Sequence, residues 1–97
     1  MTQVFLRPEA ELDVRAIARW YEEESAGLGD ELSARLGETF AKIAALPSRF
    51  PRVTGAAQRA LLRKFPYAGY SLVEDDRVVV VGVFHQHRDP MVWRDRL

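Results

Sequence analysis

The chain has 97 residues, of which 47% are hydrophobic and 29% charged, as expected for one folded domain rather than a disordered or fibrous chain. It has no cysteine, which excludes disulfides and thiolate metal sites. The formal net charge is zero, yet residues 39–73 carry six basic and no acidic side chains, while residues 1–38 carry nine acidic and four basic ones. The middle segment therefore predicts contact with an anionic partner, unless its cations pair with acids of the first helix.

The first half of the chain has the pattern of a strand followed by two helices. Gln3–Leu6 is a β-branched and aromatic stretch, and Pro8 suits the first position of the helix that follows. That helix ends in a polar, glycine-containing turn, after which Asp30 is the expected N-cap of a second helix that stops at Pro47. Gly37 lies inside the second helix, where we expect it to mark a close helix–helix approach.

The second half changes to the period of strands. Residues 47–57 are loop-like, and three strands are predicted at Arg59–Phe65, Tyr67–Glu74 and Val78–Phe84. The last is apolar on both faces, so it should be the central and most buried strand. Asp89 and Pro90 have the pattern of an N-cap and first helical residue, which predicts a short C-terminal helical turn.

These elements predict a single domain over residues 1–97 of the α+β class. An antiparallel α-hairpin packs on one face of a small, mostly antiparallel four-stranded sheet, in the order β-α-α-β-β-β plus the C-terminal helical turn. The N-terminus lacks the apolar core of a signal peptide, and the longest apolar run is too short to span a bilayer. We therefore expect a cytoplasmic protein.

The polar stretch after the last strand contains both histidines of the chain. His85 and His87 are two residues apart, so on a strand they would face the same side. No third ligand has recognisable spacing, so neither a metal nor a cofactor is expected. His87 and Arg88, assisted by Lys64, have side chains that suit RNA cleavage, by moving a proton and stabilising phosphate charge. The plain alternative is a polar strand end in which Arg88 pairs with a carboxylate.

The order and spacing of several short motifs resemble the RelE/ParE superfamily of bacterial toxins over nearly the whole chain, most closely the ParE and plasmid-stabilisation branch. The matching pieces are Pro8-x-Ala10-x-x-Asp13, Ile43-x-x-Leu46-x-x-x-Pro51, Arg59, Phe65-Pro66-Tyr67-x-x-Tyr70, Val78–Phe84 and His85-x-x-Arg88-Asp89-Pro90-x-x-Trp93. The resemblance implies the toxin component of a type II toxin–antitoxin system.

The two branches of this superfamily act differently, and the resemblance helps to choose between them. RelE-like toxins cut mRNA on the ribosome, and an arginine typically follows the tyrosine of their middle strand; here Ser71 follows Tyr70. No tyrosine occurs later in the chain. ParE-like toxins poison DNA gyrase by protein–protein contact and are not hydrolases. The ParE-like function is therefore the expectation, with a ribosome-dependent mRNA interferase and an attenuated relative that only binds its antitoxin as alternatives.

The resemblance also implies partners and surfaces. The partners are DNA gyrase and a cognate antitoxin, ParD-like or another small DNA-binding protein with a disordered C-terminal arm, so DNA binding is not expected of this chain alone. For the target, the expected contact residues are Arg63, Lys64, His85, His87, Arg88, Trp93 and Arg94. For the antitoxin, they are Ile17, Tyr21, Leu36, Phe40, Arg59, Leu61 and Arg63.

Overall fold

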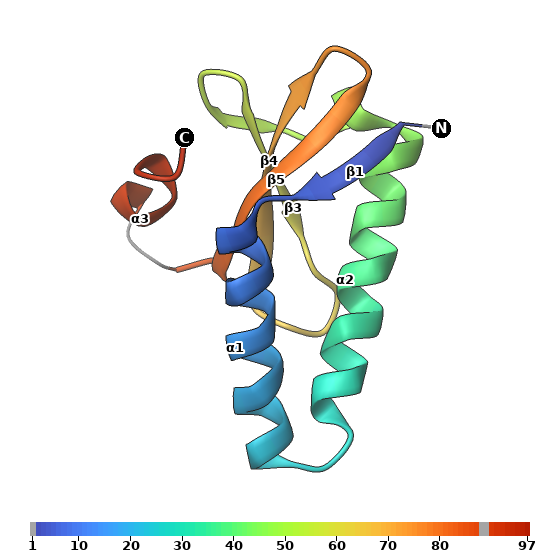
Figure 1. Cartoon of the computed structure of the whole chain (residues 1–97), viewed down its shortest axis with the longest axis vertical. Coiled ribbons are helices and arrows are strands. Elements are labelled where there is room, and N and C mark those ends of the chain that lie inside the picture. The colour runs from blue at the N-terminus through green and yellow to red at the C-terminus, as the bar shows by residue number, and fades with distance from the viewer. Residues whose placement is uncertain (1, 88–89) are drawn as a thin grey trace.

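The computed structural model describes residues 2–87 and 90–97, and its helices lie mainly on one side of a sheet (Figure 1). The elements in chain order are β1 (Gln3–Leu6), α1 (Pro8–Glu24), α2 (Leu28–Ala45), the 3-10 helix η1 (Pro47–Arg49), β2 (Arg52–Thr54), β3 (Ala57–Leu61), β4 (Tyr67–Glu74), β5 (Arg77–His85) and α3 (Pro90–Arg94). The α+β class with a helical hairpin is confirmed. Within the described residues, no helix is long and apolar enough to cross a membrane.

The sheet has five strands in the order β1-β5-β4-β3-β2, so the predicted four-stranded sheet was one strand short. β1 runs parallel to β5, and the other neighbours are antiparallel. The missed strand, β2, has three residues and a register irregularity, and it lies within the segment predicted as a loop. Such a short strand leaves no periodic signal among prolines and a glycine. β3 also begins and ends earlier than predicted, because residues 62–66 form the connection to β4.

β5 is the most buried strand, as predicted, but it lies between β1 and β4, and β4 is the middle strand of the sheet. The residues of β5 contribute to two apolar layers. Val80 and Val83 pack toward the hairpin with Leu32 and Leu36, while Val81 and Phe84 belong to a cluster on the opposite face. Val80 and Val83 are three residues apart, yet both face the hairpin, because the β4–β5 pairing shifts register between Tyr70 and Ser71. The short α3 packs against β5 and covers part of the opposite face.

The hairpin turn differs from the prediction at the start of α2. The helix begins at Leu28 after Gly27 in the left-handed conformation, so Asp30 lies in its first turn and is not the N-cap. The carboxylate of Glu22 on α1 accepts hydrogen bonds from the backbone N–H groups of Gly27 and Gly29 at 3.0–3.1 Å. A side chain from the preceding helix thus satisfies N–H groups that an N-cap residue would otherwise serve.

The close approach of the two helices occurs at Gly29 and not at Gly37, where the sequence predicted it. A Cβ atom at Gly29 would lie 2.8 Å from the carbonyl oxygen of Ala18, whereas one at Gly37 would meet nothing within 4 Å. Gly37 is exposed on α2. The two helices therefore come closest at the turn between them. The sequence prediction considered only a glycine in the middle of the second helix.

Candidate interaction surfaces

Two segments predicted to contact the target meet at one end of the sheet. The N–H of Gln86 donates to the carbonyl of Pro66 at 2.9 Å, and Tyr67 pairs with His85 across β4 and β5. The β3–β4 loop, which carries Arg63 and Lys64, therefore lies beside the histidine segment at the end of β5. The structure brings these residues together, while their contact with a target stays a prediction.

The two histidines form a small ring cluster with Tyr67. The ring centroids of Tyr67 and His85 are 5.4 Å apart, and those of His85 and His87 are 5.5 Å apart. The backbone N–H of His87 donates to Nδ1 of His85 at 3.2 Å, so a neutral His85 carries its proton on Nε2. Among the described residues, no three His, Cys, Asp or Glu side chains are grouped as metal ligands would be.

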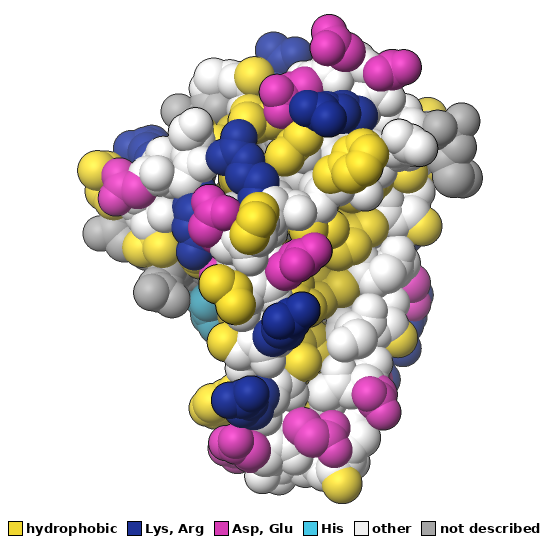
Figure 2. All heavy atoms as spheres, in the orientation of Figure 1, with side chains coloured by type: hydrophobic (Ala, Val, Ile, Leu, Met, Phe, Trp, Pro, Cys, Tyr) yellow, Lys and Arg dark blue, Asp and Glu magenta, His cyan; other side chains and the backbone are white. Residues whose placement is uncertain are grey.

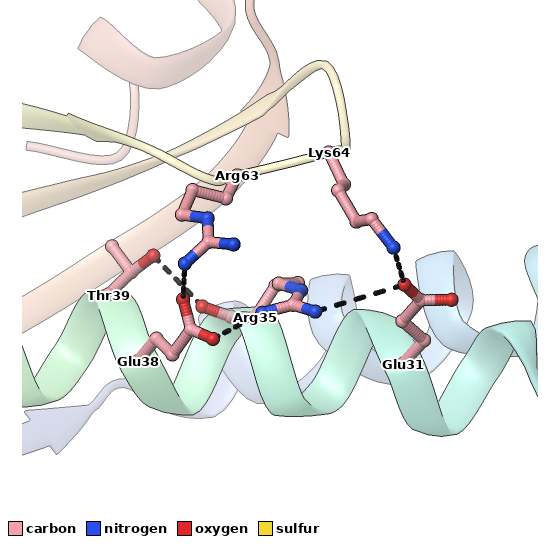
Figure 3. A network of polar contacts seen from close by, with 6 residues as sticks. All are labelled: Glu31, Arg35, Glu38, Thr39, Arg63 and Lys64. Carbon is pink, nitrogen blue, oxygen red and sulfur yellow. Dashed lines mark hydrogen bonds and ion pairs between the residues drawn. The ribbon is translucent and has the colours of Figure 1, made fainter.

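The cations of the β3–β4 loop are engaged by acidic residues of α2 (Figure 3). Lys64 Nζ lies 2.6 Å from Glu31 Oε1, and Arg63 Nη1 lies 3.5 Å from Glu38 Oε1. Arg35 lies between the two glutamates and pairs with both. The hydrogen bond and charge of Lys64 lower the pKa of Glu31. We call these five residues the α2 clamp.

The clamp bears on the alternative that acids of the first helix pair with the basic segment, because the ion-pair partners of Arg63 and Lys64 belong to α2 and not to α1. The neutralising carboxylates come from α2 because that helix lies beside the β3–β4 loop. Asp13 of α1 pairs with Arg96 near the C-terminus. Lys64 also has a positive φ of 71°, so its ion pair accompanies a backbone conformation that L-residues seldom adopt.

Four other basic residues of the middle segment lie outside the clamp, and no carboxylate of the described residues forms an ion pair with them. They are Lys42, Arg49, Arg52 and Arg59. Lys42 and Arg49 are exposed and line a groove of about 290 Å³ between α2, η1 and β3. Arg59, predicted to contact the antitoxin, is half-buried on β3. The available positive charge therefore lies to the α2–β3 side of the sheet.

The apolar residues predicted to contact the antitoxin differ in accessibility. Figure 2 shows hydrophobic side chains gathered along the furrow between α1 and α2. Ile17, Tyr21 and Phe40 are half-buried and pack against the core, but Leu36 is only 3% exposed and is itself part of the core. Leu61, on β3, is 55% exposed. Leu36 therefore offers almost no surface to a partner.

Tyr21 on α1 contacts aromatic residues at one end of the sheet. Its ring makes edge contacts with Phe65 at 4.9 Å and Tyr67 at 6.2 Å between centroids. Partial burial, and then the neighbouring Tyr67, raise the pKa of Tyr21. A continuous row of rings thus runs from α1 through the β3–β4 loop to the histidine segment.

An ion pair that sequence reasoning did not find fixes the C-terminal segment. Arg96 Nη1 and Nη2 lie 2.9 and 3.1 Å from the two carboxylate oxygens of Asp13. The guanidinium also donates to the carbonyl of Val81 at 3.2 Å and lies over the ring of Phe84 at 4.8 Å. The hydrogen bond to Asp13 raises the pKa of Arg96. Asp13 is part of the first-helix motif Pro8-x-Ala10-x-x-Asp13 that resembles the RelE/ParE superfamily, but its partner becomes evident only in the fold.

The remaining residues predicted to contact the target lie near the C-terminus, where some of them are outside the described residues. Arg88 and Asp89, the predicted N-cap, are outside the described residues. Trp93 lies on α3, whose helical course is confirmed, but its side chain is outside the described part of the chain. Arg94 is exposed on the same helix.

Two comparisons agree with this architecture. A solved structure titled "Chromosomal ParDE TA system from P. aeruginosa" superposes with a TM-score of 0.77 at 12% sequence identity, covering 88% of this chain and 96% of that one. At that identity, the likeness establishes the fold alone. No curated protein matches the sequence. The sequence model of the family described as "ParE toxin of type II toxin-antitoxin system, parDE" matches residues 4–90. The chain belongs to the ParE toxin family of type II toxin–antitoxin systems.

Proposed function

We propose that this toxin inhibits DNA gyrase by protein–protein contact in the bacterial cytoplasm and is neutralised by a cognate, ParD-like antitoxin. The observation that carries the choice of gyrase over mRNA is Ser71. Where the RNA-cleaving branch has an arginine, this chain has a serine that is 2% exposed. It pairs with Gln58, itself 3% exposed, inside the sheet. A buried hydroxyl supplies no charge to a phosphate in the transition state.

A second observation points the same way. Lys64, the lysine that would assist cleavage, is paired with Glu31 at 2.6 Å. A cation held by a carboxylate of its own chain has less charge to offer a phosphate, because the two charges largely cancel at a distance. The surface that includes His85 and His87 suits recognition by contact.

The mRNA interferase stays the alternative, and one arrangement favours it. Tyr67, His85 and His87 form a cluster of rings whose phenol and imidazole groups can each donate or accept a proton. Such neighbours suit general acid–base chemistry. The two functions make opposite predictions for cells that express the toxin.

The test is controlled expression of the toxin in bacteria, with and without the antitoxin encoded beside it. Gyrase inhibition predicts filamentous cells, an induced DNA-damage response and loss of supercoiling activity when the purified toxin is added to gyrase. Rapid translation arrest with transcripts cut in the ribosomal A site would refute the proposal in favour of the interferase. Normal growth would refute toxicity and leave the attenuated relative.

A double substitution tests whether the segment after β5 is the surface that contacts the target. His87→Ala combined with Arg88→Ala should weaken gyrase inhibition if the segment after β5 contacts the target. Arg15→Ala, on the exposed side of α1, is the matched control and should leave inhibition unchanged. Full inhibition by the double variant would remove this segment from the target surface.

A further inference from the structure

The outward side of α1 carries an exposed apolar stripe. Leu12, Ala16 and Trp20 follow one another at intervals of four residues, so they lie on one face of the helix. Leu12 is 62% exposed and Trp20 is 56% exposed, although both side chains are large and hydrophobic. The ring of Tyr21 meets that of Trp20 edge-on at 5.0 Å between centroids, which orients the indole without burying it. Large apolar side chains grouped in this way mark a contact surface.

A cavity of about 280 Å³ opens beside this stripe, between α1, β5 and α3. It is at the small end of the size range of ligand pockets, where a single ring system fits. Apolar side chains of all three elements line it, namely Ala16, Ile17, Val83 and Val92. Asp13 and Arg96 also line the cavity, but they pair with each other and so add little net charge. An uncharged aromatic group is therefore the occupant that suits the cavity.

The stripe is spaced so that it matches a second copy of itself. Leu12 and Trp20 are equally far from Ala16, at four residues or about 6 Å along the helix axis. When two copies of α1 pack antiparallel about a two-fold axis at Ala16, Trp20 of each lies beside Leu12 of the other. The small side chain of Ala16 allows the two helices to approach closely at the axis. The stripe is thus self-complementary, as a two-fold interface requires.

The same arrangement brings Trp20 of one copy to the cavity of the other. Asp13 follows Leu12 on α1 and lines the cavity together with Ala16. Trp20 and Asp13 are seven residues, or about two turns, apart, so they lie on the same side of the stripe. Two-fold symmetry sets this side against the same side of the second copy. The indole therefore comes level with Asp13 of the other copy, at the mouth of its cavity.

Charge complementarity favours the antiparallel orientation. Arg19 is exposed on the same side of α1, and no carboxylate of the described residues forms an ion pair with it. In the antiparallel pair, Arg19 of one copy lies within about one turn of Glu9 and Glu11 of the other. Glu23 comes level with Glu9 of the second copy, and Arg19 is one turn from each of them. A parallel pair would instead set Arg19 against Arg19 and Glu23 against Glu23, so opposite charges meet in the antiparallel pair.

We propose that the toxin self-associates as a two-fold symmetric dimer through the outward side of α1, with Trp20 of each copy seated in the cavity between α1, β5 and α3 of the other. The match of the stripe to its own reversed copy favours a second copy over an unrelated protein. One helix pair and one inserted ring form a small interface, so we expect a dissociation constant of about 1–100 μM. The dimer does not depend on which molecule the toxin inhibits, so this inference is independent of the proposed function.

Self-association is measured by sedimentation of the purified full chain at concentrations from about 1 to about 300 μM. Trp20→Ala should weaken it by about tenfold or more, because a buried aromatic anchor is lost. Leu61→Ala removes a side chain of similar exposure, 55%, from β3, and as the matched control should change affinity by less than about twofold. In Trp93→Phe, Trp20 is the one remaining tryptophan of the chain. Its emission should shift to shorter wavelength as the concentration rises and the indole leaves water.

Single cysteines test the register, because the chain has none of its own. Ala16→Cys places the two sulfurs beside the two-fold axis, where a disulfide can form, and should give a cross-linked dimer with oxidised glutathione. Glu23→Cys lies seven residues from the axis, so its two copies are about 21 Å apart in the antiparallel dimer and should not cross-link. Ala41→Cys, exposed on α2, is the matched control for random collision.

Each part of the proposal can fail separately from the proposed function. A chain that stays monomeric at about 300 μM would overturn the dimer. Unchanged association of Trp20→Ala would remove the indole from the interface, and cross-linking of Glu23→Cys as fast as Ala16→Cys would refute the antiparallel register. Gyrase inhibition is measured independently, so a monomeric toxin that inhibits gyrase would refute the dimer alone.

Discussion

The ion pair between Asp13 and Arg96 should control how firmly the C-terminal segment is held, and Arg96→Ala tests this. The substitution removes a two-point contact with Asp13 at 2.9 and 3.1 Å, a hydrogen bond to the carbonyl of Val81 and a cation–π contact with Phe84. Arg96 and Asp13 side chains are 25% and 16% exposed, so the pair is only partly shielded from water.

The expected loss follows from these contacts. A charge-assisted hydrogen bond contributes about 1.5–3 kcal/mol and an exposed cation–π contact about 0.5–1 kcal/mol. Partial exposure reduces both, and Asp13 retains the N–H of Val83 at 3.0 Å as a partner. We therefore expect the free energy of unfolding to fall by about 2 kcal/mol, and Tm by roughly 8–16 °C for a domain of this size.

The assay is thermal unfolding followed by circular dichroism, together with hydrogen exchange of α3 amides. Exchange in α3 should accelerate more than exchange in β4 and β5, because the lost contacts hold only the C-terminal segment. A double-mutant cycle with Asp13→Ala should give a coupling of about 1–2 kcal/mol. Arg15→Ala, exposed on the same helix as Asp13, should change stability by less than about 0.5 kcal/mol. Wild-type Tm and unchanged α3 exchange in Arg96→Ala would refute the reasoning.

Three further changes test the hairpin and the clamp. Gly29→Ala should destabilise by about 1–3 kcal/mol in chemical denaturation, because its Cβ would lie 2.8 Å from the carbonyl oxygen of Ala18. Gly37→Ala, with open space around its Cβ, should instead stabilise by about 0.5–1 kcal/mol, and a loss there would contradict this assignment. The lowered pKa of Glu31 means that its pair with Lys64 stabilises the fold above the unfolded pKa and is lost as pH falls through the folded value. Glu31→Gln should therefore flatten the decline of stability below about pH 4, and an unchanged acid limb would show that the pair contributes nothing.

Periodicity predicted the elements with strong patterns and missed those defined by their neighbours. The apolar run Val78–Phe84 marks a buried strand whatever surrounds it, and β5 is an interior strand that is buried over nearly its whole length. β2 has only three residues and exists because β3 supplies its partner. The cap of α2 was misassigned for a similar reason. Asp30 is a good N-cap by type, but Glu22 reaches the helix start across the turn.

The same distinction applies to the candidate surfaces, and it changes where charge is expected to act. A count along the chain treats the cations of residues 39–73 as one basic patch. In the fold, α2 lies beside the β3–β4 loop and its glutamates neutralise Arg63 and Lys64, while no carboxylate of the described residues forms an ion pair with Lys42 or Arg49. The cations of the β3–β4 loop are therefore less available than Lys42 and Arg49, which line the groove between α2, η1 and β3. Because charges paired within the chain must be separated before a partner can use them, acidic partners should prefer the groove between α2, η1 and β3. The sheet end with His85 should depend more on shape and aromatic contact.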